Sequence, residues 1–251
     1  MSVRFPSIAG MFYPAEPAAL KSSLEYVREF DSEEKYFAII VPHAGHAYSG
    51  KTAGEVYKKL DKNYEKVIIL APNHSVYTKK AVFDENDEWM TPIGKTPIWK
   101  IKTENEAFTT NKIVHKQEHS IEVHLPFLQT KLKKFKLLPI IIGDINEVDL
   151  NKISKEIMKY LDNKTLLIIS TDLSHFLTER DAREVDNETI NKILNLKDVT
   201  PEDACGSNPL KVANRIFKEL GKKPELVEYS TSAKTTRDTN NVVGYASFIV
   251  K

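Results

Sequence analysis

The stretch Lys66-Val-Ile-Ile-Leu-Ala-Pro-Asn-His74 opens on an apolar, β-branched run and ends in a turn that carries a histidine. Short apolar runs bounded by turn residues are typical of buried strands. The same pattern occurs at three other places in the chain, residues 36–41, 137–142 and 166–169. These four runs predict the core strands of one sheet.

The segments between and after these strands have the spacing of helices. Their apolar residues recur every three or four positions, which predicts helices at residues 52–60, 120–132, 148–161, 182–194 and 209–220. Strands that alternate with helices favour a mostly parallel sheet covered by helices. The predicted fold class is therefore α/β, with a central mostly parallel or mixed sheet flanked by helices in three layers.

Three further segments complete this prediction. Residues 224–231 and 242–250 are expected to form two strands that close one edge of the sheet, and residues 78–97 a short excursion with a small β-element. The chain has no low-complexity linker, hinge or internal repeat. A single domain over residues 1–251 is the simplest organisation.

The composition excludes several classes of protein. Of the 251 residues, 41% are hydrophobic and 28% charged, and no apolar run approaches the roughly 18 residues that a membrane helix needs. The first ten residues lack the pattern of a secretory signal, which favours a cytoplasmic protein. The 36 Lys and Arg nearly balance the 35 Asp and Glu, so no bulk positive charge points to nucleic acid.

Histidines follow three of the predicted strands. His43 and His46 come after the first strand, His74 after the second and His175 after the fourth. The carboxyl ends of parallel strands meet at one edge of a sheet, where α/β proteins bind their ligands. Neutral imidazole binds zinc, iron, copper and nickel. His43 and His74 are therefore the first candidates for metal ligands, and the alternative is that these are ordinary solvated loop histidines.

The single cysteine is a candidate for a third ligand. Cys205 lies in a loop that leads into the predicted helix 209–220, with Pro209 expected at its first position. The N-terminus of a helix favours a thiolate, which suits metal binding or redox chemistry. The alternative is a small, buried apolar side chain. One cysteine also excludes an intramolecular disulfide and any site that needs two thiolates from one chain.

Asp172 and His175 are candidates for proton chemistry. Both follow the strand at 166–169, and a carboxylate within reach of an imidazole fixes its tautomer and raises its basicity. His175 would then act as a general base or support the ligands. The alternative for Asp172 is capping of the following turn.

A second cluster of ligand-type side chains occupies residues 118–126. His119 and His124 are five residues apart, whereas the zinc-protease arrangement H-E-x-x-H places its histidines four apart on one helical face. His119 and Glu122 do share a helical face. They either line the same cleft or form a buried polar cluster that pins the helix to the sheet.

One motif points to a different class of site. Residues 45–52, Gly-His-Ala-Tyr-Ser-Gly-Lys-Thr, match the phosphate-binding pattern G-x-x-x-x-G-K-[ST] and lie between a predicted strand and a predicted helix. Against a nucleotide site, His46 and Tyr48 are bulky where backbone amides must wrap a phosphate. Such a site would also leave His43, His74 and Cys205 without a role.

Taken in order, the motifs resemble the Memo family, also labelled AmmeMemoRadiSam system protein B. The resemblance runs nearly from end to end of the chain and rests on Arg4-Phe-Pro6, Ala9-Gly10, Phe12-Tyr-Pro14, Pro42-His-Ala-Gly45, Tyr48-Ser-Gly50, Ala71-Pro-Asn-His74, Glu118-His-Ser-Ile-Glu-Val-His-Leu-Pro126, Ser170-Thr-Asp172, Ser174-His175, Cys205-Gly206 and Asn208-Pro209. In that family Lys51-Thr52 is optional, which disfavours the nucleotide site.

The resemblance implies a fold and a site. Memo proteins are similar in fold to class III extradiol (LigB-type) non-haem iron dioxygenases, and by that similarity His43, His74 and Cys205 take the positions of the metal ligands. Asp172 and His175 take those of neighbouring catalytic residues. The dioxygenases have a carboxylate as third ligand, so Cys205 is a departure that argues against ring cleavage. A thiolate shifts the preference from Fe(II) toward copper, and zinc also fits.

Two functions follow as hypotheses. The first is a metal-binding protein with a dioxygenase-like, redox-active iron or copper site that acts on a small-molecule substrate. The second is a non-enzymatic scaffold that uses the same cleft for a peptide or for partner proteins of the AMMECR-like and radical-SAM kinds that the family label implies. No nucleic-acid or membrane partner is expected.

Overall fold

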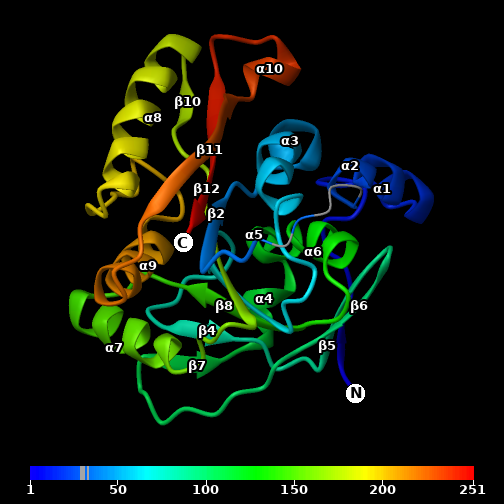
Figure 1. The fold of residues 1–251 in the computed structure, drawn as a ribbon, viewed down its shortest axis with the longest axis vertical. Helices are drawn as coiled ribbons and strands as arrows, with labels where there is room; N and C mark the ends of the chain where they lie inside the picture. The colour runs from blue at the N-terminus through cyan, green and yellow to red at the C-terminus, as the bar shows by residue number, and fades with distance from the viewer. Residues whose placement is uncertain (29–31, 33) are drawn as a thin grey trace.

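The computed structural model describes residues 1–28, 32 and 34–251. Its largest element is a mixed sheet (Figure 1) made of β2 Ala38–Val41, β3 Lys66–Pro72, β4 Ala81–Phe83, β7 Phe108–Thr110, β8 Lys136–Ile142, β9 Thr165–Ser170, β10 His175–Leu177, β11 Pro224–Thr231 and β12 Val242–Val250. Across the sheet the order is β10-β12-β2-β9-β3-β8-β4-β7, and β11 also pairs with β12.

The centre of the sheet is parallel and its flanks are antiparallel. Strands β2, β9, β3 and β8 run in the same direction, whereas β12 pairs antiparallel with β2 and β4 pairs antiparallel with β8. The predicted α/β class is confirmed. The two C-terminal strands have the expected bounds, and they extend the sheet beyond β2.

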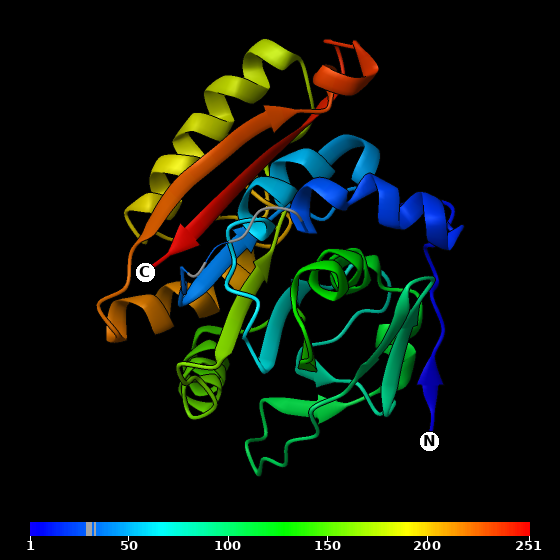
Figure 2. The ribbon, with the colours of Figure 1, turned by 45° about the vertical axis from the view of Figure 1, so that its right-hand side comes forward.

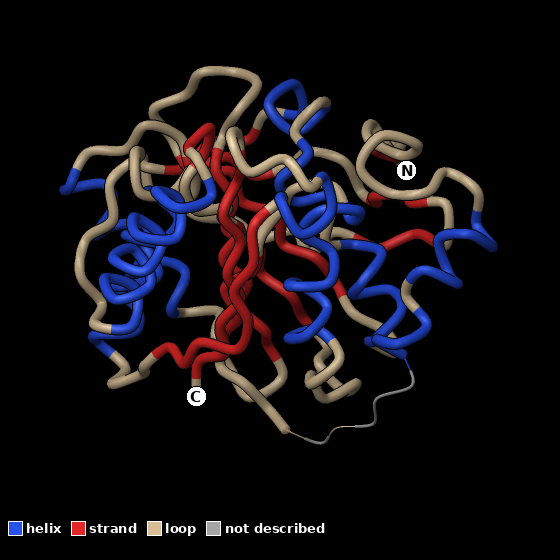
Figure 3. Tube along the Cα trace, turned by 90° about the horizontal axis from the view of Figure 1, so that it is seen from above, coloured by secondary structure: helices blue, strands red, loops and turns tan. Residues whose placement is uncertain are grey.

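Helices cover both faces of this sheet, as the strands seen edge-on in Figure 3 show. One face carries α1 Pro17–Ser23, α2 Glu25–Arg28, α3 His46–Tyr57, α4 Lys112–Lys116, α5 His119–Glu122 and α6 Leu125–Lys131; the other carries α7 Glu147–Met158, α8 Glu179–Leu194 and α9 Ser207–Glu219. Successive side chains of a strand point to opposite faces. Accordingly, Val67 and Ile69 pack with the first group, and Ile68 and Leu70 with the second.

The expected excursion at residues 78–97 is larger than a small β-element. Its first strand, β4, joins the main sheet, while β5 Glu88–Thr91 and β6 Gly94–Pro97 form a separate three-stranded sheet with β1 Val3–Arg4. A short helix, α10 Ala233–Thr236, lies between β11 and β12. Among the described residues no helix is long and apolar enough to cross a membrane.

Several expected helix boundaries were wrong, including the end of α7 at Met158 and the start of α8 at Glu179. The helix expected at 52–60 begins at His46. The one expected at 120–132 divides into α5 and α6, because Pro126 has no N–H to continue the ladder from the preceding turn. Helix α9 begins at Ser207, so Pro209 is its third residue.

The early start of α3 excludes a phosphate-binding loop at residues 45–52, the alternative that the sequence already disfavoured. Gly45 is the N-cap, so Gly50, Lys51 and Thr52 lie in the second turn of the helix. No loop remains between Gly45 and Gly50 whose amides could wrap a phosphate. Thr52 is buried, and its hydroxyl hydrogen-bonds that of Ser230 in β11 at 2.6 Å.

A buried ion pair fastens the N-terminal segment to α5. The Arg4 guanidinium donates to Glu122 at 2.6 Å, and both side chains are almost fully buried. The Glu122 carboxylate also accepts from the backbone N–H groups of Ser7 and Ile8 and from the Tyr13 hydroxyl at 2.6 Å. A carboxylate with this many donors holds the segment as one unit.

We expect Glu122→Gln to lower the free energy of unfolding by about 3 kcal/mol, because it leaves the Arg4 charge buried without its partner. Urea denaturation followed by circular dichroism measures this. Glu104 is an exposed carboxylate, so Glu104→Gln should change the stability by less than about 0.5 kcal/mol. Equal effects of the two substitutions would contradict a structural role for the ion pair.

The same pair should give the parent protein an acid-sensitive stability. Burial acts to raise the pKa of Glu122, but Arg4, Tyr13 and Ser7 outweigh it and hold the pKa below its usual value. A lowered folded-state pKa stabilises above the unfolded value of about 4.3, and the stabilisation is lost as the pH falls through the folded value. Stability in Glu122→Gln should therefore fall less steeply below about pH 4 than in the parent.

Candidate metal centre

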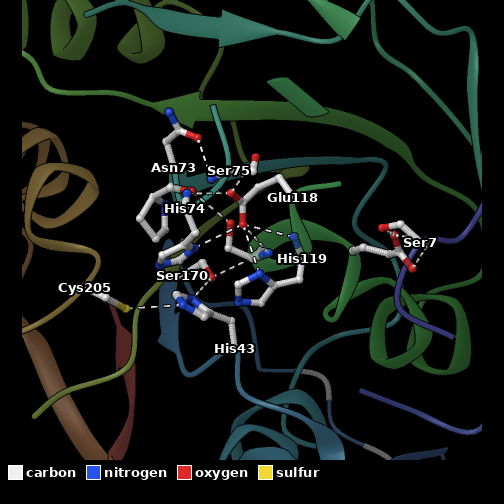
Figure 4. A network of polar contacts seen from close by, with 12 residues as sticks. Ser7, His43, Asn73, His74, Ser75, Glu118, His119, Ser170 and Cys205 are labelled. Carbon is white, nitrogen blue, oxygen red and sulfur yellow. Dashed lines mark hydrogen bonds and ion pairs between the residues drawn. The ribbon is translucent and has the colours of Figure 1, made fainter. Parts of the chain in front are cut away.

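Three adjacent strands deliver the predicted site residues to one edge of the sheet. His43 follows β2, Asp172 follows β9 and His74 follows β3, and these strands are neighbours in the order β2-β9-β3. Cys205 arrives from the turn before α9 (Figure 4). The structure thus places His43 and His74 at the same edge of the sheet, where the strand-end argument expected them, and Cys205 beside His43.

A third histidine joins them. One ligand nitrogen from each of His43, His74 and His119 lies within 4.8 Å of the others. The rings of His74 and His119 stack at 4.9 Å between centroids, and His43 meets both edge-on at 5.2 and 5.4 Å. His119 is the first residue of α5, so its side chain projects from the helix start into the site.

Ser170 fixes the orientation of His43. The Ser170 hydroxyl donates its one hydrogen to the Ser120 carbonyl at 2.7 Å, so it can only accept from His43 Nδ1 at 2.7 Å and from His124 Nε2 at 2.9 Å. His43 then carries its proton on Nδ1, and its Nε2 is left with a free lone pair. Burial, followed by the neighbouring imidazoles, holds the pKa of His43 well below its usual value, so the ring is neutral.

Glu118 fixes the orientation of His74. Its buried carboxylate accepts from His74 Nδ1 at 3.1 Å and from the His74 backbone N–H at 2.6 Å, and it also accepts from the backbone N–H groups of His119 and Ser120. Burial acts to raise the pKa of Glu118, but the hydrogen bonds from His74 and Ser120 bring it to about 2. A carboxylate behind an imidazole orients the ring and strengthens it as a metal ligand.

Cys205 touches the histidine cluster through His43. Its Sγ lies 3.3 Å from His43 Nε2 and accepts the Asp172 backbone N–H at 3.2 Å. The loop can approach β9 this closely because residue 206 is glycine: a Cβ there would lie 2.5 Å from the Ser170 carbonyl oxygen. Burial, with the Asp172 charge, raises the pKa of the thiol well above its usual value. The prediction that the helix N-terminus favours the thiolate of Cys205 is therefore wrong for this thiol when no cation is nearby.

Asp172 and His175 lie at the site but do not pair with each other. The Asp172 carboxylate accepts the His43 backbone N–H at 2.8 Å, and His175 Nδ1 hydrogen-bonds the Leu173 carbonyl at 2.8 Å. The bond that orients His175 thus comes from the backbone. Burial raises the pKa of Asp172 to about 7, although the amides of His43 and Ala44 act against this rise.

A small polar cavity opens beside these residues. It has a volume of about 370 Å³, and its lining includes His74, Cys205, Asn73, Asn208 and Asp144. This is large enough for a small molecule and has room for little of a folded partner. The cavity gives His74 and Cys205 access to solvent on one side.

Sequence reasoning left the roles of residues 118–126 open, and the structure separates them. His119 reaches the histidine cluster, whereas Glu122 binds Arg4 and His124 lies fully buried against Ser170. Glu118 and Ser170 were not singled out. The clustering of ligand-type residues at 118–124 was the signal that pointed to this segment. The expectation of one continuous helix predicted the wrong faces for these side chains, because the segment divides into α5 and α6.

The arrangement defines a class of protein: an α/β fold with imidazoles and a thiol gathered at the carboxyl ends of parallel strands. The model of the family described as Memo-like protein matches residues 4–249. A MEMO1 family protein of Archaeoglobus fulgidus is 33% identical over 99% of this chain and all of its own length. Others are 37% identical in Aquifex aeolicus, over 99% of both chains, and 34% in Methanosarcina barkeri, over 99% of this chain and all of the relative. The chain belongs to the Memo family.

We expect nitrogen-detected NMR to find a proton on Nδ1 of His43 and on Nε2 of His124, because Ser170 can accept from both and donate to neither. In Ser170→Ala the preference should weaken for both rings. Ser154→Ala removes a buried hydroxyl in α7 and is the matched control. A proton on His43 Nε2 in the parent protein would contradict the assignment.

Proposed function

We propose that this protein binds one transition metal ion at the cluster of His43, His74 and His119, with Cys205 beside it as the alternative to His119 for the third ligand. The observation that carries the proposal is the convergence of three ligand nitrogens within 4.8 Å of one another. Fe(II) or copper is the metal we favour, and zinc is the alternative, because the donors are imidazole nitrogens and a sulfur.

The donor atoms fit a metal ion in their protonation states as well as in their positions. A ligand imidazole has to be neutral, and burial keeps His43 in that form. Ser170 and Glu118 hold the Nδ1 atoms of His43 and His74, which leaves Nε2 of each as the ligand atom. Bonds of about 2.1 Å hold two nitrogens at most roughly 4.2 Å apart, so the ligand nitrogens have to draw slightly closer together when a metal binds.

The third protein ligand is either His119 or Cys205. His119 has its nitrogen within the cluster, while the Cys205 sulfur lies 3.3 Å from His43 Nε2. The thiol must lose its proton to bind, and a metal cation supplies the positive charge that its surroundings lack. The family resemblance favours Cys205, and the geometry adds His119.

A bound redox metal would supply electron transfer or polarise a substrate oxygen. The chain provides the rest of the machinery. His175, with Nδ1 held by the Leu173 carbonyl, keeps Nε2 free to take or give a proton at the edge of the site. Asp172 fixes the backbone of His43. The cavity of about 370 Å³ suits a small polar substrate.

Anaerobic calorimetric titration of the metal-free protein with Fe(II), and separately with Cu(I), tests the proposal. We expect saturable one-to-one binding that His74→Ala weakens at least about 100-fold, because both a ligand and its Glu118 bond are lost. Loss of binding in Cys205→Ala but not in His119→Ala assigns the sulfur as third ligand; the reverse assigns the imidazole.

His175→Ala is the matched control, since it removes an imidazole outside the cluster and should leave the affinity unchanged. Equal affinity of the parent and the double variant His43→Ala/His74→Ala would sink the metal proposal. That result would favour the cleft as a docking surface, and capture of AMMECR-like or radical-SAM partner proteins by the double variant would then be the measurement to make.

A further inference from the structure

A second and larger cavity lies on the outer side of α3. It has a volume of about 650 Å³ and lies between residues 10–14, α1–α2, α3 and α6, which are neighbours in Figures 1 and 2. This volume is in the range of ligand sites in proteins. None of its lining residues belongs to the proposed metal centre.

Phe12 separates the two sites. Its ring lies 4.8 Å from that of His119, and Phe12 is also part of the wall of the larger cavity. The Phe12 carbonyl accepts the His46 N–H at 2.7 Å, which ties this wall to the start of α3. The larger cavity is therefore adjacent to the histidine cluster but distinct from it, and an occupant of this cavity need not touch a metal.

The wall of this cavity includes four aromatic side chains. Phe12, Tyr13, Tyr26 and Phe127 contribute to it. The hydroxyl of Tyr13 donates to Glu122 and that of Tyr26 to the Gly50 carbonyl at 3.1 Å, so the polar ends of both rings are already engaged. What these tyrosines offer to an occupant is ring surface, which favours a flat, apolar body.

One positive charge on this wall is unengaged. Lys51 is exposed, and among the described residues it has no ion-pair or hydrogen-bond partner for its side chain. Glu55, on the next turn of α3, is bound to Lys58 at 2.6 Å. His46 adds no charge, because burial lowers its pKa to about 4, although its bond to the Val123 carbonyl acts against this. The lining therefore holds one cation without a partner, Lys51, and one carboxylate, Glu55, whose charge Lys58 balances.

We propose that this cavity binds a small aromatic carboxylate, with its ring among Phe12, Tyr26 and Phe127 and its carboxylate on Lys51. The ring recovers the apolar contact that the cavity leaves open to water. The carboxylate provides the partner that Lys51 lacks. A neutral aromatic molecule of the same shape satisfies the first requirement only, so charge is what sets the specificity of the site.

The probe is 3-phenylpropionate, compared with the neutral 3-phenylpropanamide, in titrations of the metal-free protein followed by amide NMR shifts. We expect both to shift the signals of Gly50, Lys51 and Phe127, and the acid to bind about fivefold more tightly, the size of one exposed ion pair. In Lys51→Gln the two probes should bind equally. Lys155→Gln, on α7 across the sheet, is the matched control and should keep the preference.

A filling variant tests the place of binding. Ala47 is exposed and lines the cavity, so Ala47→Trp should occupy it without disturbing the core and abolish binding of both probes. His74→Ala should leave both affinities unchanged. Equal binding of acid and amide by the parent protein, unaltered binding in Ala47→Trp, or shifts confined to residues around Cys205 would each overturn the proposal.

Discussion

The candidate site depends on the single hydrogen of the Ser170 hydroxyl. Ser170 ends β9, the strand between β2 and β3, and it is fully buried. Because it donates to the Ser120 carbonyl, it must accept from His43 and His124, and this sets which nitrogen of His43 is free. A backbone carbonyl of α5 thereby determines the tautomer of a ligand on a different element. The sheet and α5 have to be docked before the site exists.

Two carboxylates at the two ends of α5, those of its N-cap Glu118 and its last residue Glu122, serve different purposes. Glu118 faces inward and holds His74 for the site, while Glu122 faces the N-terminal segment and holds Arg4. Both are buried and both stay ionised, because each is surrounded by donors that outweigh the cost of burial. The short helix α5 therefore connects the candidate metal centre to the first residues of the chain. Phe12, which belongs to those residues, lies with its ring tilted against that of His119 and forms part of the wall of the neighbouring cavity.

Much of the fold could be predicted from local pattern. Apolar runs in the sequence located β2, β3, β8 and β9, and their alternation with helices indicated a parallel centre, because only buried parallel strands are apolar on both faces. The bounds of β11 and β12 followed from the same argument. Helix starts were less predictable: α3 begins six residues early, since Gly45 caps it and its first turn packs beneath Phe12. Residues 45–52 match the phosphate-binding motif in residue type, but their backbone is helical and does not form the loop that the motif requires.

The sequence by itself predicted that His43 and His74 would meet, because the ends of neighbouring parallel strands share an edge and both histidines follow such strands. It offered Cys205 only as a candidate from a loop before a helix. It could not determine which partners would hold them. Glu118, His119 and Ser170 act through distances of about 3 Å across elements far apart in the chain, and such distances depend on how α5 docks on the sheet. Only the tertiary structure decided that His119 turns toward the site, that Asp172 binds the His43 backbone instead of His175, and that burial keeps the Cys205 thiol protonated. Periodicity encodes which face a side chain takes, whereas hydrogen bonding between elements is settled by packing.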